Sequence, residues 1–163
     1  MQRYLLTLQV TDRKGLVEQI AHAINHHHGN WLNSELHHMD GIFAAIILLE
    51  VPKANWDTLL ENIECIEGIS LTYQAVAATQ KQQTFSFTLV ANDRLGLVKD
   101  VANVINSLGH NIEKLSTTYE SASHSGTALF KADICVNIGA EVQTDTIIEA
   151  LYKLGNDVQI DLD

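Results

Sequence analysis

A five-residue pattern, Asp-Arg-x-Gly-Leu, occurs twice in the chain and brings together groups that could bind a small charged ligand. It runs from Asp12 to Leu16 and again from Asp93 to Leu97. Glycine permits unusual backbone dihedrals and lets a ligand approach the main chain closely. A helix that begins after the glycine offers unpaired N–H groups and the positive end of its dipole, which favour a carboxylate. Because the aspartates could accept an ammonium group, each turn suits a zwitterionic amino acid.

A structural interpretation of the same turns is also open. Asp12 and Asp93 could be helix caps and nothing more, while Gly15 and Gly96 shape the turn and the arginines stay solvated. Short motifs of this length are frequent by chance, so the residue types alone do not decide between the two interpretations.

The turns belong to an internal repeat. A shift of 81 positions places Asp12 on Asp93, and the match continues without a gap to Asn30, which falls on Asn111. Such a match is hard to obtain by chance and indicates two copies of one folding unit. We therefore expect one unit at residues 1–77, a linker at 78–83 and a second unit at 84–163.

Each copy shows the same succession of hydrophobic patterns. Alternating apolar residues predict a first strand at 4–10 and at 85–91, and helical spacing after each turn predicts a helix with one apolar stripe. The expected stripe residues are Leu16, Val17, Ile20, Ala21 and Ile24 in the first copy, and Leu97, Val98, Val101, Ala102, Ile105 and Leu108 in the second.

Residues that begin or end elements complete the outline. Gly29 and Gly109 are predicted to end the first helices, and Asn55 and Thr144 to cap the second ones. In the first copy the remaining strands are expected at 31–39, 42–51 and 69–76; the strand at 42–51 is expected to be buried and follows a tight Asp40-Gly41 hairpin. In the second copy they are expected at 112–119, 127–136 and 157–162, with a polar hairpin at 120–126. The order βαββαβ, found twice, predicts the α+β class. We expect two tandem ferredoxin-like domains, each a four-stranded antiparallel sheet with two helices on one face.

A unit of this kind, with the glycine turn after its first strand and Asn opening its second, resembles the ACT domain. The matching residues, which by this resemblance are the expected ligand-binding set, are Asp12, Arg13, Gly15, Leu16, Asn30, Asp93, Arg94, Gly96, Leu97 and Asn111. Lys14 and Leu95 stand where the family has Pro, so the turns lose the rigidity of that ring. Two such units over essentially the entire chain resemble the glycine cleavage system transcriptional repressor family.

The resemblance implies an amino-acid-responsive transcriptional regulator without a DNA-binding domain of its own. Such a protein would restrain a separate DNA-binding activator, and glycine would relieve the restraint. The resemblance implies neither an enzyme nor a cofactor, and it is compatible with a monomer or a homodimer. An ACT-type regulatory subunit that controls a metabolic enzyme is the alternative function.

Charge and composition agree with a protein partner. Twenty Asp and Glu against ten Lys and Arg give a net charge of −10, which repels nucleic acid, and the cations form no run. The apolar run at 42–49 is too short to cross a membrane, and the alternating N-terminal residues predict a strand and not a signal peptide. Only two cysteines are present, so we expect a cytoplasmic protein without direct nucleic-acid or membrane contact.

Histidines concentrate in the first copy, at His22, His26, His27, His28, His37 and His38. The spacing of His22 and His26 places them on one helix face, where two imidazoles can hold a metal. A solvated helix end is the other interpretation, because cationic histidine suits the C-terminal dipole. The second copy lacks the cluster, so we expect no metal site, and a metal-responsive module is the second alternative function.

No catalytic arrangement is predicted. Ser123-His124-Ser125 places a hydroxyl beside an imidazole, but sequence neighbours in a polar hairpin rarely form a relay. Cys65 and Cys135 lie next to isoleucines and are expected to be buried, inert thiols.

Overall fold

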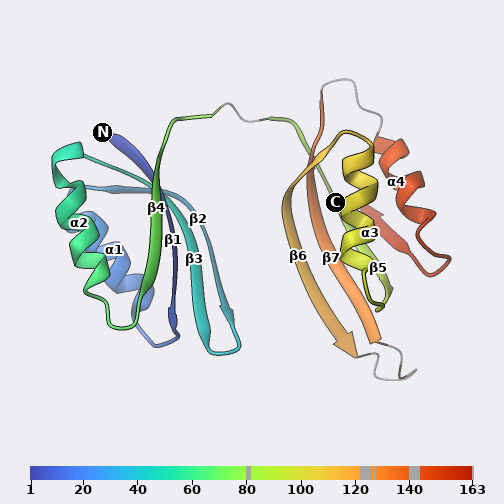
Figure 1. Ribbon diagram of the computed structural model, residues 1–163, viewed down its shortest axis with the longest axis horizontal. Coiled ribbons are helices and arrows are strands. Elements are labelled where there is room, and N and C mark those ends of the chain that lie inside the picture. The colour runs from blue at the N-terminus through green and yellow to red at the C-terminus, as the bar shows by residue number, and fades with distance from the viewer. Residues whose placement is uncertain (80–81, 122–125, 127, 140–143, 163) are drawn as a thin grey trace. The chain divides into compact units, whose positions relative to one another are not determined.

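The computed structural model describes residues 1–79, 82–121, 126, 128–139 and 144–162. The chain divides into two compact units, Met1–Thr79 and Gln80–Asp163. Each unit repeats the order βαββαβ around one four-stranded antiparallel sheet (Figure 1). The tandem ferredoxin-like α+β fold expected from the sequence is therefore confirmed.

The first unit has the sheet order β2-β3-β1-β4. The central strands β1 and β3 align Leu6 with Ile47, and both side chains are fully buried. The elements are β1 (Gln2–Thr11), α1 (Leu16–His26), β2 (Asn30–Met39), β3 (Ile42–Val51), the short 3-10 helix η1 (Lys53–Asn55), α2 (Trp56–Glu64) and β4 (Ser70–Val76).

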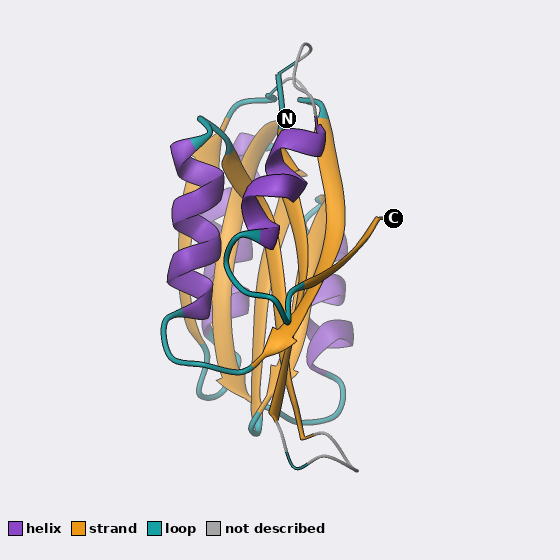
Figure 2. Cartoon of the chain, turned by 90° about the vertical axis from the view of Figure 1, so that its right-hand side faces the viewer, coloured by secondary structure: helices purple, strands orange, loops and turns teal. Residues whose placement is uncertain are grey.

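The second unit has the equivalent order β6-β7-β5-β8. Its elements are β5 (Thr84–Asn92), α3 (Leu97–Ser107), β6 (Asn111–Ser121), β7 (Ala128–Asn137), α4 (Thr144–Tyr152) and β8 (Gln159–Leu162). Figure 2, viewed from the side of this unit, shows its two helices lying against one face of the sheet. Of the hairpin predicted at 120–126, residues 122–125 lie outside the described part of the chain.

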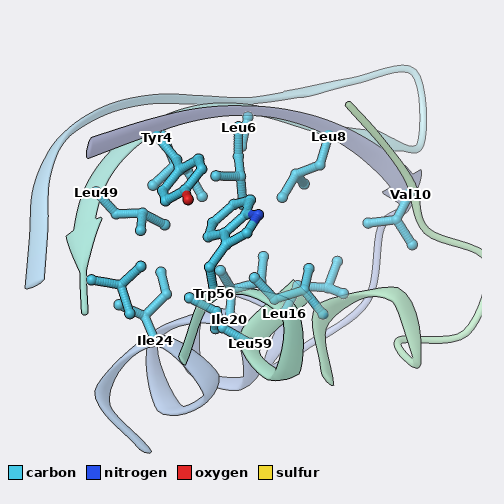
Figure 3. Packing of buried hydrophobic residues seen from close by; sticks show 14 of the residues in the cluster. Tyr4, Leu6, Leu8, Val10, Leu16, Ile20, Ile24, Leu49, Trp56 and Leu59 are labelled. Atoms are coloured by element: carbon cyan, nitrogen blue, oxygen red, sulfur yellow. The ribbon is translucent and has the colours of Figure 1, made fainter. Parts of the chain in front are cut away.

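The core of the first unit lies between one face of its sheet and the two helices. Figure 3 shows the side chains of β1 pointing from the strand towards the helical layer, where Trp56 of α2 meets them. The Tyr4 and Trp56 rings stack with centroids 3.5 Å apart, and Tyr73 of β4 meets the indole edge-on at 5.0 Å. Burial raises the pKa of the Tyr4 hydroxyl, and the nearby Asp57 carboxylate and Tyr73 raise it further.

The apolar helix stripes are narrower than predicted. Only Leu16, Ile20 and Ile24 of α1, and Leu97, Val101 and Ile105 of α3, are buried. Val17 is 48% exposed and Val98 44%. A residue next to an inward-facing one is rotated by about 100° around the helix, which turns both valines, and also Ala21, away from the sheet.

The prediction of a buried strand at 42–51 is correct for one face only. Phe43, Ala45 and Ile47 are buried, whereas Ile42 and Ile46 are 42% and 48% exposed. Successive side chains of a strand alternate between faces, and the helices cover one face of this sheet. The apolar composition of the strand therefore does not mean burial on both sides.

The end of α1 differs from the sequence prediction, whereas the end of α3 agrees with it. Gly109 follows the end of α3 with φ of 80°, as expected of a terminating glycine, but after α1 the left-handed residue is His28, with φ of 59°. Gly29 has another role: an added Cβ would lie 2.9 Å from both Cγ2 and the carbonyl oxygen of Ile24. Close packing, and not a left-handed conformation, requires glycine at position 29.

The residue predicted to cap α2 has that position without the capping bond: Asn55 is the N-cap residue of α2, but its side chain makes no hydrogen bond to this helix. Asn55 precedes α2, but its amide donates to the carbonyl oxygen of His27, 3.0 Å away, and not to the start of α2. Asn55 thus satisfies an acceptor at the end of α1, in a neighbouring helix. Thr144 is the first described residue of α4, and residues 140–143 before it lie outside the described part of the chain.

Candidate functional site at the glycine turns

Both glycine turns have the same backbone conformation. Gly15 and Gly96 are the N-cap residues of α1 and α3, with φ of 87° and 82°. Among the described residues no side chain caps either helix, so the interpretation of Asp12 and Asp93 as helix caps is wrong. By helix geometry, the first N–H groups of each helix have no intrahelical acceptor, and they carry the positive end of its dipole.

Main-chain hydrogen bonds attach each turn to its own sheet. The N–H of Asp12 donates to the carbonyl oxygen of Gly41 at 2.9 Å, and the N–H of Asp93 donates to that of Ala128 at 2.8 Å. The buried side chains of Leu16 (2% exposed) and Leu97 (3%) anchor the following helices in the core. These two leucines, which belong to the predicted ligand set, therefore position the turn through packing.

The polar residues of the first turn have partners outside it. The Asp12 carboxylate lies 3.7 Å from Nε2 of His38, on β2. The Arg13 guanidinium donates to the carbonyl oxygen of Glu67 at 3.0 Å, beyond the end of α2. The first turn is thus attached to β2 and to the segment that follows α2.

A groove of about 900 Å³ opens beside the first turn, between α1 and α2. We call it the α1–α2 groove, and it includes Arg13, Gly15, Glu18, Gln19, His22 and Cys65. Its charged groups are of both signs, as the binding of a zwitterion requires. The sequence predictions did not include Glu18, Gln19 or Cys65 in a ligand site, because only the packing of α2 on α1 brings them together.

The second turn differs in its ionic partner. The Arg94 guanidinium lies 2.6 Å from the Asp100 carboxylate, which belongs to α3. Leu95 is fully exposed at this turn. The predicted ligand set did not include Asp100. The sequence does carry a signal for it, because Asp100 lies six residues after Arg94 and the first copy has Gln19 at the equivalent position.

Asn30 and Asn111 do not meet the turns of their own units. Asn30 pairs with Glu50, which pairs with Arg3 near the start of β1, whereas the turn follows the opposite end of β1. Asn111 likewise pairs with Asn137, which pairs with Thr84 at the start of β5. Within each unit the structure therefore separates the asparagine from the Asp-Arg-x-Gly turn.

The histidines of the first unit do not form one cluster. His22 and His26 lie parallel on α1 with ring centroids 6.1 Å apart, and His37 and His38 instead lie 3.8 Å from Glu35 and 3.7 Å from Asp12. In the part of the chain that the structure describes, no three His, Cys, Asp or Glu side chains are arranged to hold a metal. The observed contacts give the metal-responsive alternative no support.

His27 connects the two helices of the first unit. Its ring nitrogens lie 2.6 Å from the Asn62 amide nitrogen and 3.5 Å from the Thr58 hydroxyl, both on α2. Together with the bond from Asn55 to the His27 carbonyl, these contacts fix the end of α1 against α2.

The thiols are less buried than predicted. Cys65 is exposed in the α1–α2 groove, and Cys135 is half-buried on β7.

The Ser123-His124-Ser125 segment lies outside the described residues. Across the described ranges, every helix is too short or too polar to span a membrane.

A second hollow, of about 430 Å³, lies on the open face of the first sheet over Thr7, Ala44 and Ile46. Its floor consists of β-strands, whose backbone N–H groups are largely used in the sheet. The glycine turn, with helix N–H groups that lack intrahelical acceptors, is therefore the stronger candidate for binding a carboxylate.

The observed topology defines the chain as a tandem ferredoxin-like α+β protein with a glycine turn after the first strand of each unit. It is similar over 99% of its length to the crystal structure of an unknown protein from Galdieria sulphuraria, with 97% of that chain covered, 22% identity and a TM-score of 0.82. It is also similar to the crystal structure of a candidate glycine cleavage system transcriptional repressor, with 99% and 96% coverage, 16% identity and a TM-score of 0.66. No family model and no curated protein matches the chain. The predicted resemblance is thus confirmed at the level of the fold.

Proposed function

We propose that the chain is an amino-acid-responsive transcriptional regulator that acts through a DNA-binding partner protein, with glycine as its effector. The observation that carries the proposal is the glycine turn: a left-handed glycine starts a helix that no described side chain caps, beside an aspartate and an arginine. The full-length likeness in fold to a candidate glycine cleavage repressor supports the choice of effector and process.

The turn offers complementary groups for both ends of an amino acid. The first N–H groups of the helix and the adjacent arginine favour a carboxylate. The carboxylate of Asp12, which is partly exposed, can accept an ammonium group. Because a zwitterion has no net charge, the −10 charge of the chain does not oppose its approach.

A bound amino acid can regulate only if it prefers one state of the protein over another. In the proposed mechanism the ligand stabilises one arrangement of the turn and of the elements attached to it, and the partner recognises that arrangement. The negative charge favours a protein partner over direct contact with DNA. The role of the chain is accordingly binding and not catalysis.

A panel of amino acids in a thermal-shift assay tests the ligand half of the proposal. A ligand that binds only the native state raises the melting temperature. We expect glycine to raise it in a concentration-dependent way, and larger side chains to raise it less. The absence of a shift with every amino acid would contradict amino-acid sensing.

Affinity capture with and without glycine tests the partner half. We expect the immobilised chain to retain a LysR-type activator, identified by mass spectrometry, and to release it when glycine is added. The chain alone should not retard promoter DNA in a gel. Retention of a biosynthetic enzyme instead would favour the regulatory-subunit alternative.

A further inference from the structure

The two glycine turns have the same backbone but differ in what occupies their arginine. In the second unit Nη1 of Arg94 lies 2.6 Å from Oδ2 of Asp100, a charge-assisted hydrogen bond. Asp100 belongs to the first turn of α3, so its carboxylate also stabilises the positive end of that helix. The Asp100 carboxylate therefore already occupies Arg94 in the way that the carboxylate of a ligand would.

The first turn has no equivalent carboxylate at that position. The residue that aligns with Asp100 is Gln19, which lines the α1–α2 groove. Arg13 donates instead to the neutral carbonyl oxygen of Glu67, a contact that does not compensate the charge of the guanidinium. An open groove of about 900 Å³ adjoins this arginine and Gly15.

From this difference we infer that only the first unit binds the amino acid, in the α1–α2 groove, and that Asp100 closes the second turn to ligands. This inference rests on the proposed function. It adds the number of amino acids bound per chain and names Asp100 as the residue that sets this number. A ligand carboxylate at the second turn would have to displace the Asp100 carboxylate from Arg94. At the first turn, no carboxylate of the described residues forms an ion pair with Arg13, which donates to a main-chain carbonyl oxygen.

The groove also defines the chemistry of the ligand. Arg13 lies beside the start of α1 and attracts a carboxylate, while Glu18, in the first turn of α1 and on the wall of the same groove, can accept an ammonium group. The charges of opposite sign suit a small zwitterion better than a simple anion or a cation.

Calorimetric titration of the full chain with glycine measures the stoichiometry directly. We expect one glycine per wild-type chain. Asp100→Gln, which gives the second turn the residue of the first, should raise the stoichiometry towards two. The reciprocal change Gln19→Asp should weaken binding by about tenfold or more, because an internal carboxylate then competes for Arg13.

Two control variants match these changes in charge. Asp161→Asn removes an exposed carboxylate from β8, and Asn33→Asp adds one to β2 while preserving the acceptor for the Ser34 N–H. Both should bind glycine as the wild type does. Thermal unfolding of every variant shows that a loss of binding is not a loss of fold.

Cys65 provides an independent readout in the same groove. It is exposed and lines the groove, whereas Cys135 is half-buried in the second unit and serves as the internal reference. Glycine should slow the reaction of Cys65 with a maleimide and leave the rate of Cys135 unchanged, as measured by mass spectrometry of the labelled peptides.

The outcomes separate the inference from the proposed function. Two glycines per wild-type chain, or unchanged affinity in Gln19→Asp, would overturn the assignment of one open site while amino-acid sensing stands. Protection of Cys135 in place of Cys65 would overturn it as well. The absence of heat with glycine and every other amino acid would overturn both.

Discussion

His28 occupies a left-handed conformation at the position where the second unit has Gly109. A Cβ in this region crowds the following carbonyl oxygen, which costs an L-residue about 1–2 kcal/mol. The next residue, Gly29, packs so closely on Ile24 that an added Cβ would lie 2.9 Å from it. Loss of the side chain at position 28 should therefore stabilise the fold, whereas gain of a side chain at position 29 should destabilise it.

We predict that His28→Gly raises the free energy of unfolding by about 0.5–1 kcal/mol, since relief of the strained conformation is partly offset by the greater chain entropy of glycine. Gly29→Ala should lower it by about 1–3 kcal/mol through overpacking. Urea titrations followed by tryptophan fluorescence measure both, because both tryptophans lie in the first unit. Destabilisation by His28→Gly would contradict the account of this helix end.

Tyr4 makes the stability of the first unit sensitive to alkaline pH. Its raised pKa means that the folded state retains the hydroxyl proton at a pH where the unfolded chain, with a tyrosine pKa of about 10, has lost it. The stabilisation that comes from the Tyr4 proton is fully present below the tyrosine pKa of the unfolded chain. As the pH rises from there towards the pKa of Tyr4 in the folded state, the free energy of unfolding falls.

We predict that Tyr4→Phe, which keeps the ring stacked on Trp56, reduces this alkaline loss of stability. Urea midpoints of the wild type and the variant, measured at a series of pH values on both sides of 10, test the prediction. Tyr152→Phe is the control, because Tyr152 is 47% exposed and belongs to the second unit. Equal slopes for wild type and Tyr4→Phe would contradict the role of Tyr4.

At the scale of elements, side chains of α2 and its preceding turn hold the end of α1. Asn55 donates to the His27 carbonyl at 3.0 Å, and the Asn62 amide lies 2.6 Å from the His27 ring. The Thr58 hydroxyl donates in turn to the Asn55 carbonyl at 3.1 Å. The polar contacts between the helices thus pass through residue types that would ordinarily cap a helix.

Asn55→Asp distinguishes this arrangement from an ordinary helix cap. Aspartate is as good a cap as asparagine, but its carboxylate cannot donate to the His27 carbonyl. We predict a loss of about 1 kcal/mol in the free energy of unfolding, measured by urea denaturation. Unchanged or greater stability would show that residue 55 acts as a cap of α2.

The hydrophobic periods of the sequence predict the elements well, because burial on a sheet or helix follows spacing that is local in the chain. The alternation in β1 and the row Leu16, Ile20, Ile24 are examples. Partners that meet only after packing were not predictable. The Arg13 to Glu67 bond joins residues 54 positions apart, and the bond from Asn55 to His27 joins two elements.

Over the whole molecule, the duplication produces two units with the same fold and with different residues beside the glycine turn. Gly15 and Gly96 share one conformation, whereas Gln19 and Asp100 differ in charge at equivalent positions. We propose that the segment 78–83 is the linker between them. The repeat made the two turns visible in the sequence, but the ion pair of the second turn was visible only in the structure.

The most direct test is a calorimetric titration of the full chain with glycine, repeated for Arg13→Ala and Arg94→Ala. We predict saturable heat with one glycine per chain. Binding should weaken by about tenfold in Arg13→Ala, because the cation in the groove that pairs with the ligand carboxylate is lost, and stay unchanged in Arg94→Ala. No heat from glycine or from any other small amino acid would contradict the assignment of the glycine turn as an amino-acid site.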